Sequence, residues 1–201
     1  MIFKRFFDIV AAIFGLVVTL PVFIIIFILM KIQMPGPVFF KQNRVGRHGK
    51  LFRMIKFRSM KVNHGGSSVS VKGESRITPL GAKMRKYKID EFPEFWNILI
   101  GDMSFVGPRP DVPGYADKLT GDDRLLLTFR PGLTGAASLK YSNEEELLAL
   151  QDNPQKYNDT VLYPNKVKIE INYIRHWSFW LDIKIILHTL IGKKLTEAWA
   201  N

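Results

Sequence analysis

The hydrophobic positions of this chain are concentrated in one long segment near its N-terminus, and mixed stretches follow. Residues 9–30 are almost entirely apolar over about 22 positions, which is the length that a helix needs to cross a hydrocarbon core. The segment is too long for a cleaved signal peptide, and no small-residue cleavage site follows it. The pattern therefore predicts a membrane helix.

Pro21 and the flanking charges bear on the topology of this helix. Proline inside a helix removes one hydrogen bond and clashes with the preceding turn, so Pro21 predicts a kink, where the Thr19 hydroxyl could satisfy a freed carbonyl. Basic residues lie on both sides of the segment, Lys4 and Arg5 before it and Lys31 after it, and positive flanks normally stay cytoplasmic. These charges favour a helix that enters, bends and leaves by the same face. An ordinary single span with a tolerated proline is the alternative, and the residues alone leave both open.

The remainder of the chain predicts a domain of short helices with one small β-hairpin. Residues 38–40 and 51–57 resemble paired strands, and the Gly/Ser-rich residues 64–70 resemble a loop. Helices are expected, from their start and stop signals, at residues 78–88, 90–101 and 143–150. We expect Asp90 to cap the second of these. The chain is thus expected to have a membrane segment over residues 1–33 and one domain over 34–201, of an α/β class that is mostly helical.

The C-terminal stretch from Trp177 has the spacing of an amphipathic helix. Trp180, Ile183, Leu187 and Leu190 fall on one face of such a helix. An aromatic start suits the headgroup boundary of a membrane, whereas the same spacing is also typical of a core helix in a soluble domain. The pattern slightly favours the core helix and does not exclude the interfacial one.

The charge balance indicates anionic partners. The 201 residues include 29 lysine and arginine against 18 aspartate and glutamate, a formal charge of +11. Such an excess suits nucleic acid, acidic lipid headgroups or phosphorylated substrates. Aromatic residues are not interleaved with the basic stretch, and no nucleic-acid motif is present, so nucleic acid is not expected as a partner. The chain has no cysteine, which excludes disulfides and thiolate metal sites.

The residues with the most chemical promise are Asp90, Glu91 and Arg109. Acidic residues are common in the first turn of a helix, so the pair alone is a weak signal. Adjacent helical residues do not face each other, which predicts different roles: one carboxylate attacks or binds metal, and the other moves a proton or positions a group. We expect Asp90 to stay ionised near the helix N-terminus. Arg109 lies between two prolines that preset its direction, which suits an anion clamp, although a purely structural turn is also possible.

Residues 90–110, which run DEFPEFWNILIGDMSFVGPRP, complete a recognisable pattern. The chain resembles the small monotopic phosphoglycosyl transferases of the bacterial sugar transferase family, and the similarity extends over nearly its whole length. Further matching segments are residues 56–60 (KFRSM), 77–81 (ITPLG), 130–135 (RPGLTG) and 179–184 (FWLDIK). The resemblance implies transfer of a sugar-1-phosphate from a UDP-sugar to undecaprenyl phosphate, with release of UMP.

The resemblance also implies roles for individual residues. Asp90 would be the nucleophile that forms a covalent phosphosugar intermediate and would bind Mg²⁺, and Glu91 would complete the dyad through proton transfer or metal positioning. The cations expected at the phosphates are Arg109, Arg85, Lys56 and Arg58. A re-entrant membrane helix bent at Pro21 is implied as well, on the cytoplasmic face of the bacterial inner membrane among its lipids. Downstream glycosyltransferases are partners that this role would allow.

Two departures from the family pattern and two alternative functions accompany this hypothesis. Glu94 stands where glutamine is usual, and residues 136–141 differ from the usual stretch, so the sugar donor cannot be copied from better-known members. One alternative is a non-enzymatic, basic, membrane-tethered module that binds anionic lipid or nucleic acid. The other is a membrane phosphatase that passes the phosphosugar to water.

Overall fold

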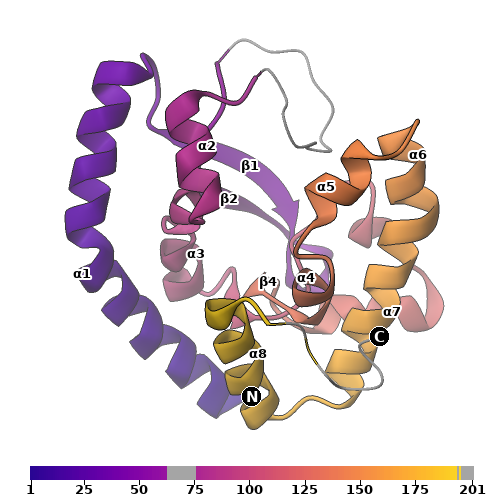
Figure 1. The fold of residues 1–201 in the computed structure, drawn as a ribbon. Coiled ribbons are helices and arrows are strands. Elements are labelled where there is room, and N and C mark those ends of the chain that lie inside the picture. Colours follow the sequence, from indigo (N-terminus) through magenta and orange to yellow (C-terminus); the bar gives the residue numbers. More distant parts are fainter. Residues whose placement is uncertain (63–75, 194, 196–201) are drawn as a thin grey trace.

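The predicted membrane helix is α1, Ile2–Gln33, which runs along one side of the other elements and is visibly bent (Figure 1). The computed structural model describes residues 1–62, 76–193 and 195, so the loop predicted at residues 64–70 lies outside the described residues. By length and composition α1 could cross a membrane. Pro21 lies inside it, and the Thr19 hydroxyl donates to the Gly15 carbonyl at 2.6 Å. Thr19 therefore does not satisfy the carbonyl freed by the proline, which is that of Val17, four residues before it.

One face of α1 packs against the rest of the chain at both ends. Ala12 is fully buried with Ile98 and Met103, and Met30 is fully buried with Phe57 and Met84 at the other end. The opposite face carries exposed apolar side chains, among them Phe3, Phe6, Ile13, Phe14, Val17, Val18, Ile24, Ile25 and Ile28. One face of α1 therefore packs against the other described residues, and its opposite face exposes apolar side chains.

The predicted hairpin consists of β1, Phe39–Val45, and β2, Leu51–Phe57. The strands pair antiparallel, from Phe39 opposite Phe57 to Val45 opposite Leu51. β1 extends well beyond the expected residues 38–40, because residues 41–44 are all polar or charged and do not alternate with apolar ones, which hides the strand pattern in the sequence. The turn uses left-handed backbone at His48 and Gly49.

The segment with the candidate dyad is divided between a 3₁₀ turn and a helix. The helix α2, Pro79–Lys86, begins as predicted, with the Thr78 hydroxyl accepting from Gly81 N at 3.0 Å. A 3₁₀ turn, η2, Ile89–Glu91, follows, and α3, Glu94–Ile100, ends at Gly101 in left-handed conformation. The expectation that Asp90 caps this helix is wrong, because Asp90 lies inside η2 and the N-cap position of α3 is Pro93, which provides no side-chain cap.

The second half of the chain contains a small parallel sheet that the pattern does not predict. Strands β3, Ser104–Val106, and β4, Gly132–Thr134, pair parallel. The surrounding elements are η3 (Ala116–Lys118), η4 (Gly121–Thr128), α4 (Ala136–Lys140), α5 (Glu144–Ala149), α6 (Pro154–Tyr157), η5 (Asn158–Leu162), α7 (Tyr163–Arg175) and α8 (Phe179–Ile191). The described residues thus form a mostly helical fold with a small antiparallel hairpin, as expected. The helix predicted at residues 143–150 is α5.

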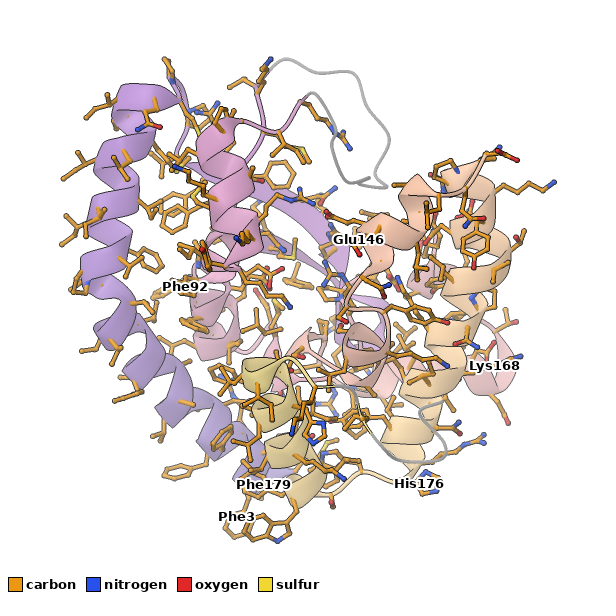
Figure 2. The ribbon with its side chains drawn as sticks, viewed as in Figure 1. Phe3, Phe92, Glu146, Lys168, His176 and Phe179 are labelled. Carbon is orange, nitrogen blue, oxygen red and sulfur yellow. The ribbon has the colours of Figure 1, made fainter. Side chains whose placement is uncertain are left out.

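The C-terminal helix α8 is held against the start of α1. Lys4 Nζ lies 2.5 Å from Asp182 Oδ2, in a buried ion pair between the two helices. Phe3 and Phe179 accordingly lie at the same end of the molecule (Figure 2). One face of α8 belongs to the core, where Ile185 is fully buried, while Trp180 remains 78% exposed. The core-helix interpretation therefore holds for one face only.

Candidate active site

Asp90 and Glu91 lie in η2, between α2 and α3, directly after Lys88, which adopts a left-handed conformation. Asp90 is buried and Glu91 is half-buried. Burial and the adjacent Glu91 raise the pKa of Asp90 above its ordinary value of 3.8, although Lys56 and Arg85 act in the opposite direction. Nearby cations, rather than a helix N-terminus, therefore favour the ionised form of this carboxyl.

Lys56 of β2 connects the hairpin to the acidic segment. Its Nζ donates to Glu91 Oε1 at 2.8 Å and lies 3.0 Å from Glu94 Oε1. Burial alone would raise the pKa of Glu91, but Lys56 and Arg109 lower it to about 2. Glu91 is therefore a permanent anion at neutral pH, held in place by the lysine.

Glu94 is a third carboxyl of the site, and we did not assign it a role from the sequence. It is 2% exposed, and burial raises its pKa to about 7 despite the nearby Lys56, with a further increase from Glu91. A signal was present in the sequence, since residues three apart lie on the same face of a helical turn. The lysine that both acids share could not be identified that way.

Arg109 follows β3 in a turn that is fixed from several sides. A Cβ on Gly107 would lie 2.3 Å from the Arg130 carbonyl, so only glycine allows this close approach. Arg44 of β1, which our sequence analysis missed, donates through Nη1 to the Pro110 carbonyl at 3.0 Å. Within the described part of the chain, the exposed Arg109 guanidinium makes no hydrogen bond of its own. Its donors are thus not used by other described residues, and the prediction of an anion clamp stays a prediction.

The other two cations predicted at the phosphates, Arg85 and Arg58, lie in different parts of the structure. Arg85 of α2 forms an ion pair with Glu145 of α5 and acts electrostatically on Asp90. Arg58 is buried and donates to the carbonyls of Met34 and Pro35 at the end of α1. The structure therefore brings Lys56, Arg109 and Arg85 to the dyad and turns Arg58 toward the membrane helix.

The carboxylates were tested for their fit to Mg²⁺. Among the described residues, no group of three or more acidic or histidine side chains is arranged to hold a metal ion. Magnesium usually binds one or two carboxylates together with substrate phosphates and water, and does not require such a cage. Lys56 Nζ lies within 3.0 Å of both Glu91 and Glu94, which leaves Asp90 as the carboxylate that fits a Mg²⁺ carried by a diphosphate.

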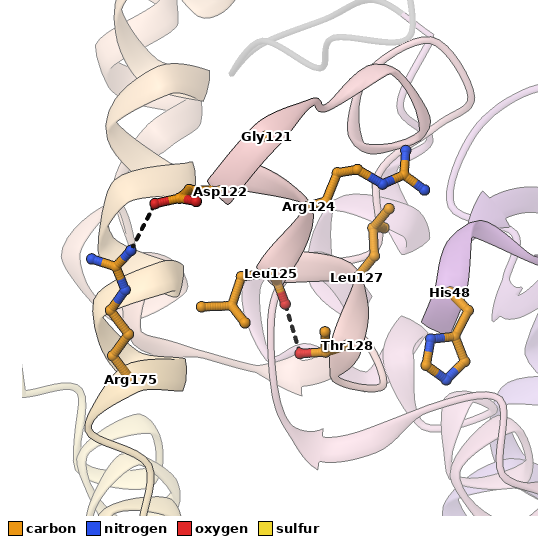
Figure 3. A pocket seen from close by; sticks show the side chains of 8 residues that line it. All are labelled: His48, Gly121, Asp122, Arg124, Leu125, Leu127, Thr128 and Arg175. Carbon is orange, nitrogen blue, oxygen red and sulfur yellow. Dashed lines mark hydrogen bonds and ion pairs between the residues drawn. The ribbon is translucent and has the colours of Figure 1, made fainter.

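A pocket of about 520 Å³ lies elsewhere, between the hairpin turn, η4 and α7 (Figure 3). His48, Arg124 and Arg175 line it, and Arg175 lies 3.4 Å from Asp122 at its edge. None of the predicted catalytic or phosphate-binding residues contributes to its lining. We therefore place the candidate active site by its side-chain chemistry and not by this hollow.

A family model and several known proteins are similar to this chain over nearly its whole length. The sequence model of the family described as bacterial sugar transferase matches residues 1–194. The galactosyl transferase CpsE of Streptococcus agalactiae is 38% identical over 94% of this chain and 42% of its own length. The UDP-N-acetylgalactosamine-undecaprenyl-phosphate N-acetylgalactosaminephosphotransferase of Aeromonas hydrophila is 34% identical, over 93% and 42%. The UDP-glucose:undecaprenyl-phosphate glucose-1-phosphate transferase of Escherichia coli is 35% identical, over 97% and 41%. The chain thus spans about two fifths of the length of these relatives.

Proposed function

This chain belongs to the bacterial sugar transferase family, and on that premise we propose that it is a phosphoglycosyl transferase. It moves a sugar-1-phosphate from a UDP-sugar to undecaprenyl phosphate and releases UMP. Two relatives named for this type of reaction support the substrate classes. The observation that carries the proposal is the convergence of Asp90, Glu91, Lys56 and Arg109, two carboxylates and two cations from three separate segments. The comparisons lend no support to a non-enzymatic binding module.

The proposed reaction proceeds in two displacements at one phosphorus. An Asp90 carboxylate oxygen attacks the phosphorus that carries the sugar, the bond to the bridging oxygen breaks, and UMP leaves with that oxygen. A phosphate oxygen of undecaprenyl phosphate then attacks the same phosphorus and releases Asp90. Burial makes Asp90 more basic than an ordinary aspartate, which favours its role as the nucleophile. Bound Mg²⁺ would neutralise diphosphate charge.

The contacts of Glu91 favour one of the roles considered for it. A general acid or base works best with a pKa near the operating pH, whereas the pKa of Glu91 is about 2. Its hydrogen bond to Lys56 supports a positioning role instead, in which Glu91 holds the ammonium beside the phosphates. Arg109, in the turn after β3, would bind the same phosphates as a second cation.

A re-entrant membrane helix is part of the proposal. Lys4 near the start of α1 pairs with Asp182, and Met30 near its end packs on Phe57, so both ends are attached to the same body. Attachment of both ends supports entry and exit by one face, and the basic flanks favour the cytoplasmic face. The exposed Trp180 supports contact of α8 with the membrane interface.

One assay tests the reaction. Membrane-bound protein is incubated with Mg²⁺, undecaprenyl phosphate and, in turn, UDP-glucose, UDP-galactose and UDP-N-acetylgalactosamine, and UMP is measured. We expect UMP release with one or more donors, its loss in Asp90→Asn, and its retention in Asp152→Asn, a matched change at an exposed site. Unchanged turnover in Asp90→Asn would refute the mechanism. UMP accompanied by free sugar phosphate would favour the phosphatase, and no turnover with any donor would favour the binding module.

The topology has its own test. Because the chain has no cysteine, Ile2→Cys introduces a single thiol just before α1 becomes apolar. A membrane-impermeant maleimide should label it only when the cytoplasmic face is accessible. Labelling from the periplasmic side of intact cells would rule out the re-entrant helix.

A further inference from the structure

Glu94 occupies an unusual position for an acidic residue. It is the first residue of α3 and is 2% exposed, with Oε1 at 3.0 Å from Lys56 Nζ. The ammonium of Lys56 donates to Glu91 at 2.8 Å, whereas Glu94 Oε1 has no hydrogen-bond partner among the described residues. The two acids therefore share one lysine unequally, and Glu91 has the better contact.

Four charged groups act on Glu94, and each belongs to a different segment. Lys56 extends from β2, Glu91 from η2 and Arg109 from the turn after β3, and Arg44 of β1 also interacts with Glu94 electrostatically. Lys56 is hydrogen-bonded to Glu91, and Arg109 also acts on that same carboxylate. Of two carboxylates that share one cation, the more deeply buried one with the weaker contact is the one that takes up a proton more readily.

We propose that Glu94 is a positioning residue of the transfer reaction, which in its protonated form leaves Lys56 and Arg109 available to the donor diphosphate. The inference rests on the proposed function, because it concerns the same phosphate-binding cations. When Glu94 loses its proton, a new negative charge appears beside Lys56. That charge competes for the ammonium and repels the diphosphate, so donor binding weakens.

The direction of the pH effect follows from the environment. Burial and Glu91 raise the pKa of Glu94 to about 7, so the acid is protonated below that pH and ionised above it. Catalytic efficiency toward the UDP-sugar should accordingly fall as the pH rises through about 7. Glutamine has nearly the shape of a protonated glutamate and cannot ionise, so Glu94→Gln should retain the low-pH behaviour at all pH values.

The experiment compares kcat/KM for the UDP-sugar between pH 6 and pH 9 in wild type, Glu94→Gln and Glu170→Gln. Glu170 is a matched control, since it is a buried glutamate with a raised pKa that accepts from Ala137 N and does not contact Lys56. We expect an excess fall of about tenfold in wild type and Glu170→Gln relative to Glu94→Gln, as for one unit charge placed near a partly screened phosphate. The ratio between variants cancels any titration of the substrates or of Asp90.

A second measurement reports the proton directly. Infrared difference spectra at pH 6 and pH 9 should contain the carbonyl band of a protonated carboxylic acid that Glu94→Gln removes, whether or not the enzyme turns over. Identical pH profiles in wild type and Glu94→Gln, or an unchanged infrared band, would overturn the inference. If instead Asp90→Asn turns over normally, the proposed function fails while the infrared result still decides the state of Glu94. A misfolded Glu94→Gln protein, detected by circular dichroism, would also count against the inference, because an isostere of the protonated acid should fold.

Discussion

Replacing Lys56 with methionine removes the cation that Glu91 and Glu94 share while keeping a side chain of similar length. The pKa of Glu91 is about 2 in the folded protein against an ordinary 4.5. At about 1.4 kcal/mol per pH unit, this difference corresponds to about 3 kcal/mol of net favourable interaction. Lys56 supplies its largest favourable part, followed by Arg109. Partial solvent exposure of the pair reduces the loss expected in Lys56→Met to about 2–3 kcal/mol at pH 7.

The pH dependence makes this prediction specific. Because the folded pKa of Glu91 is lowered, its stabilisation is fully present above pH 4.5 and is lost as the pH falls toward 2. The effect of Lys56→Met on the free energy of unfolding should therefore shrink to less than about half at pH 3. Urea unfolding in detergent, followed by tryptophan fluorescence, measures both values. Lys83→Met, at an exposed position of α2, should change stability by less than about 0.5 kcal/mol. An equal loss at pH 3 and pH 7 would refute the reasoning.

Two further substitutions test the packing that places the site. Lys4→Met leaves Asp182 buried without its cation and should lower the free energy of unfolding by about 3–5 kcal/mol, measured by thermal unfolding. Lys31→Met, at the exposed end of α1, should lower it little. Equal melting temperatures of the two variants would contradict the pairing of α1 with α8. Gly81→Ala places a Cβ 1.9 Å from the Ser59 carbonyl oxygen. We expect the free energy of unfolding to fall by more than about 3 kcal/mol, so that the protein aggregates on size-exclusion chromatography. A monodisperse, stable Gly81→Ala protein would show that this approach is not tight.

Short-range sequence signals identified the elements that are determined by residues close to one another in the sequence. Hydrophobicity predicted α1, a hydroxyl followed by proline predicted the start of α2, and Gly101 marked the end of α3. The parallel pair β3 and β4 could not be found this way. Each strand has only three residues, and Ser104 pairs with Gly132, so its stability depends on contacts distant in sequence.

The candidate site shows the same division. The adjacency of Asp90 and Glu91 is a property of the sequence, and so is the rigid turn at Arg109. The contact of Lys56 with both Glu91 and Glu94 is tertiary and became visible only in the structure. Strand alternation would place Arg58 on the same face as Lys56, but β2 ends at Phe57 and Arg58 turns to the end of α1 instead.

The central claim is that Asp90 carries the phosphosugar between donor and acceptor. The protein is incubated with Mg²⁺ and the active UDP-sugar in the absence of undecaprenyl phosphate. It is then digested, and the masses of its peptides are measured by mass spectrometry. We expect one sugar-phosphate on the peptide that contains Asp90, its loss on addition of undecaprenyl phosphate, and its absence in Asp90→Asn. Turnover without any such adduct under quenched conditions, or an adduct on another residue that persists in Asp90→Asn, would contradict the account.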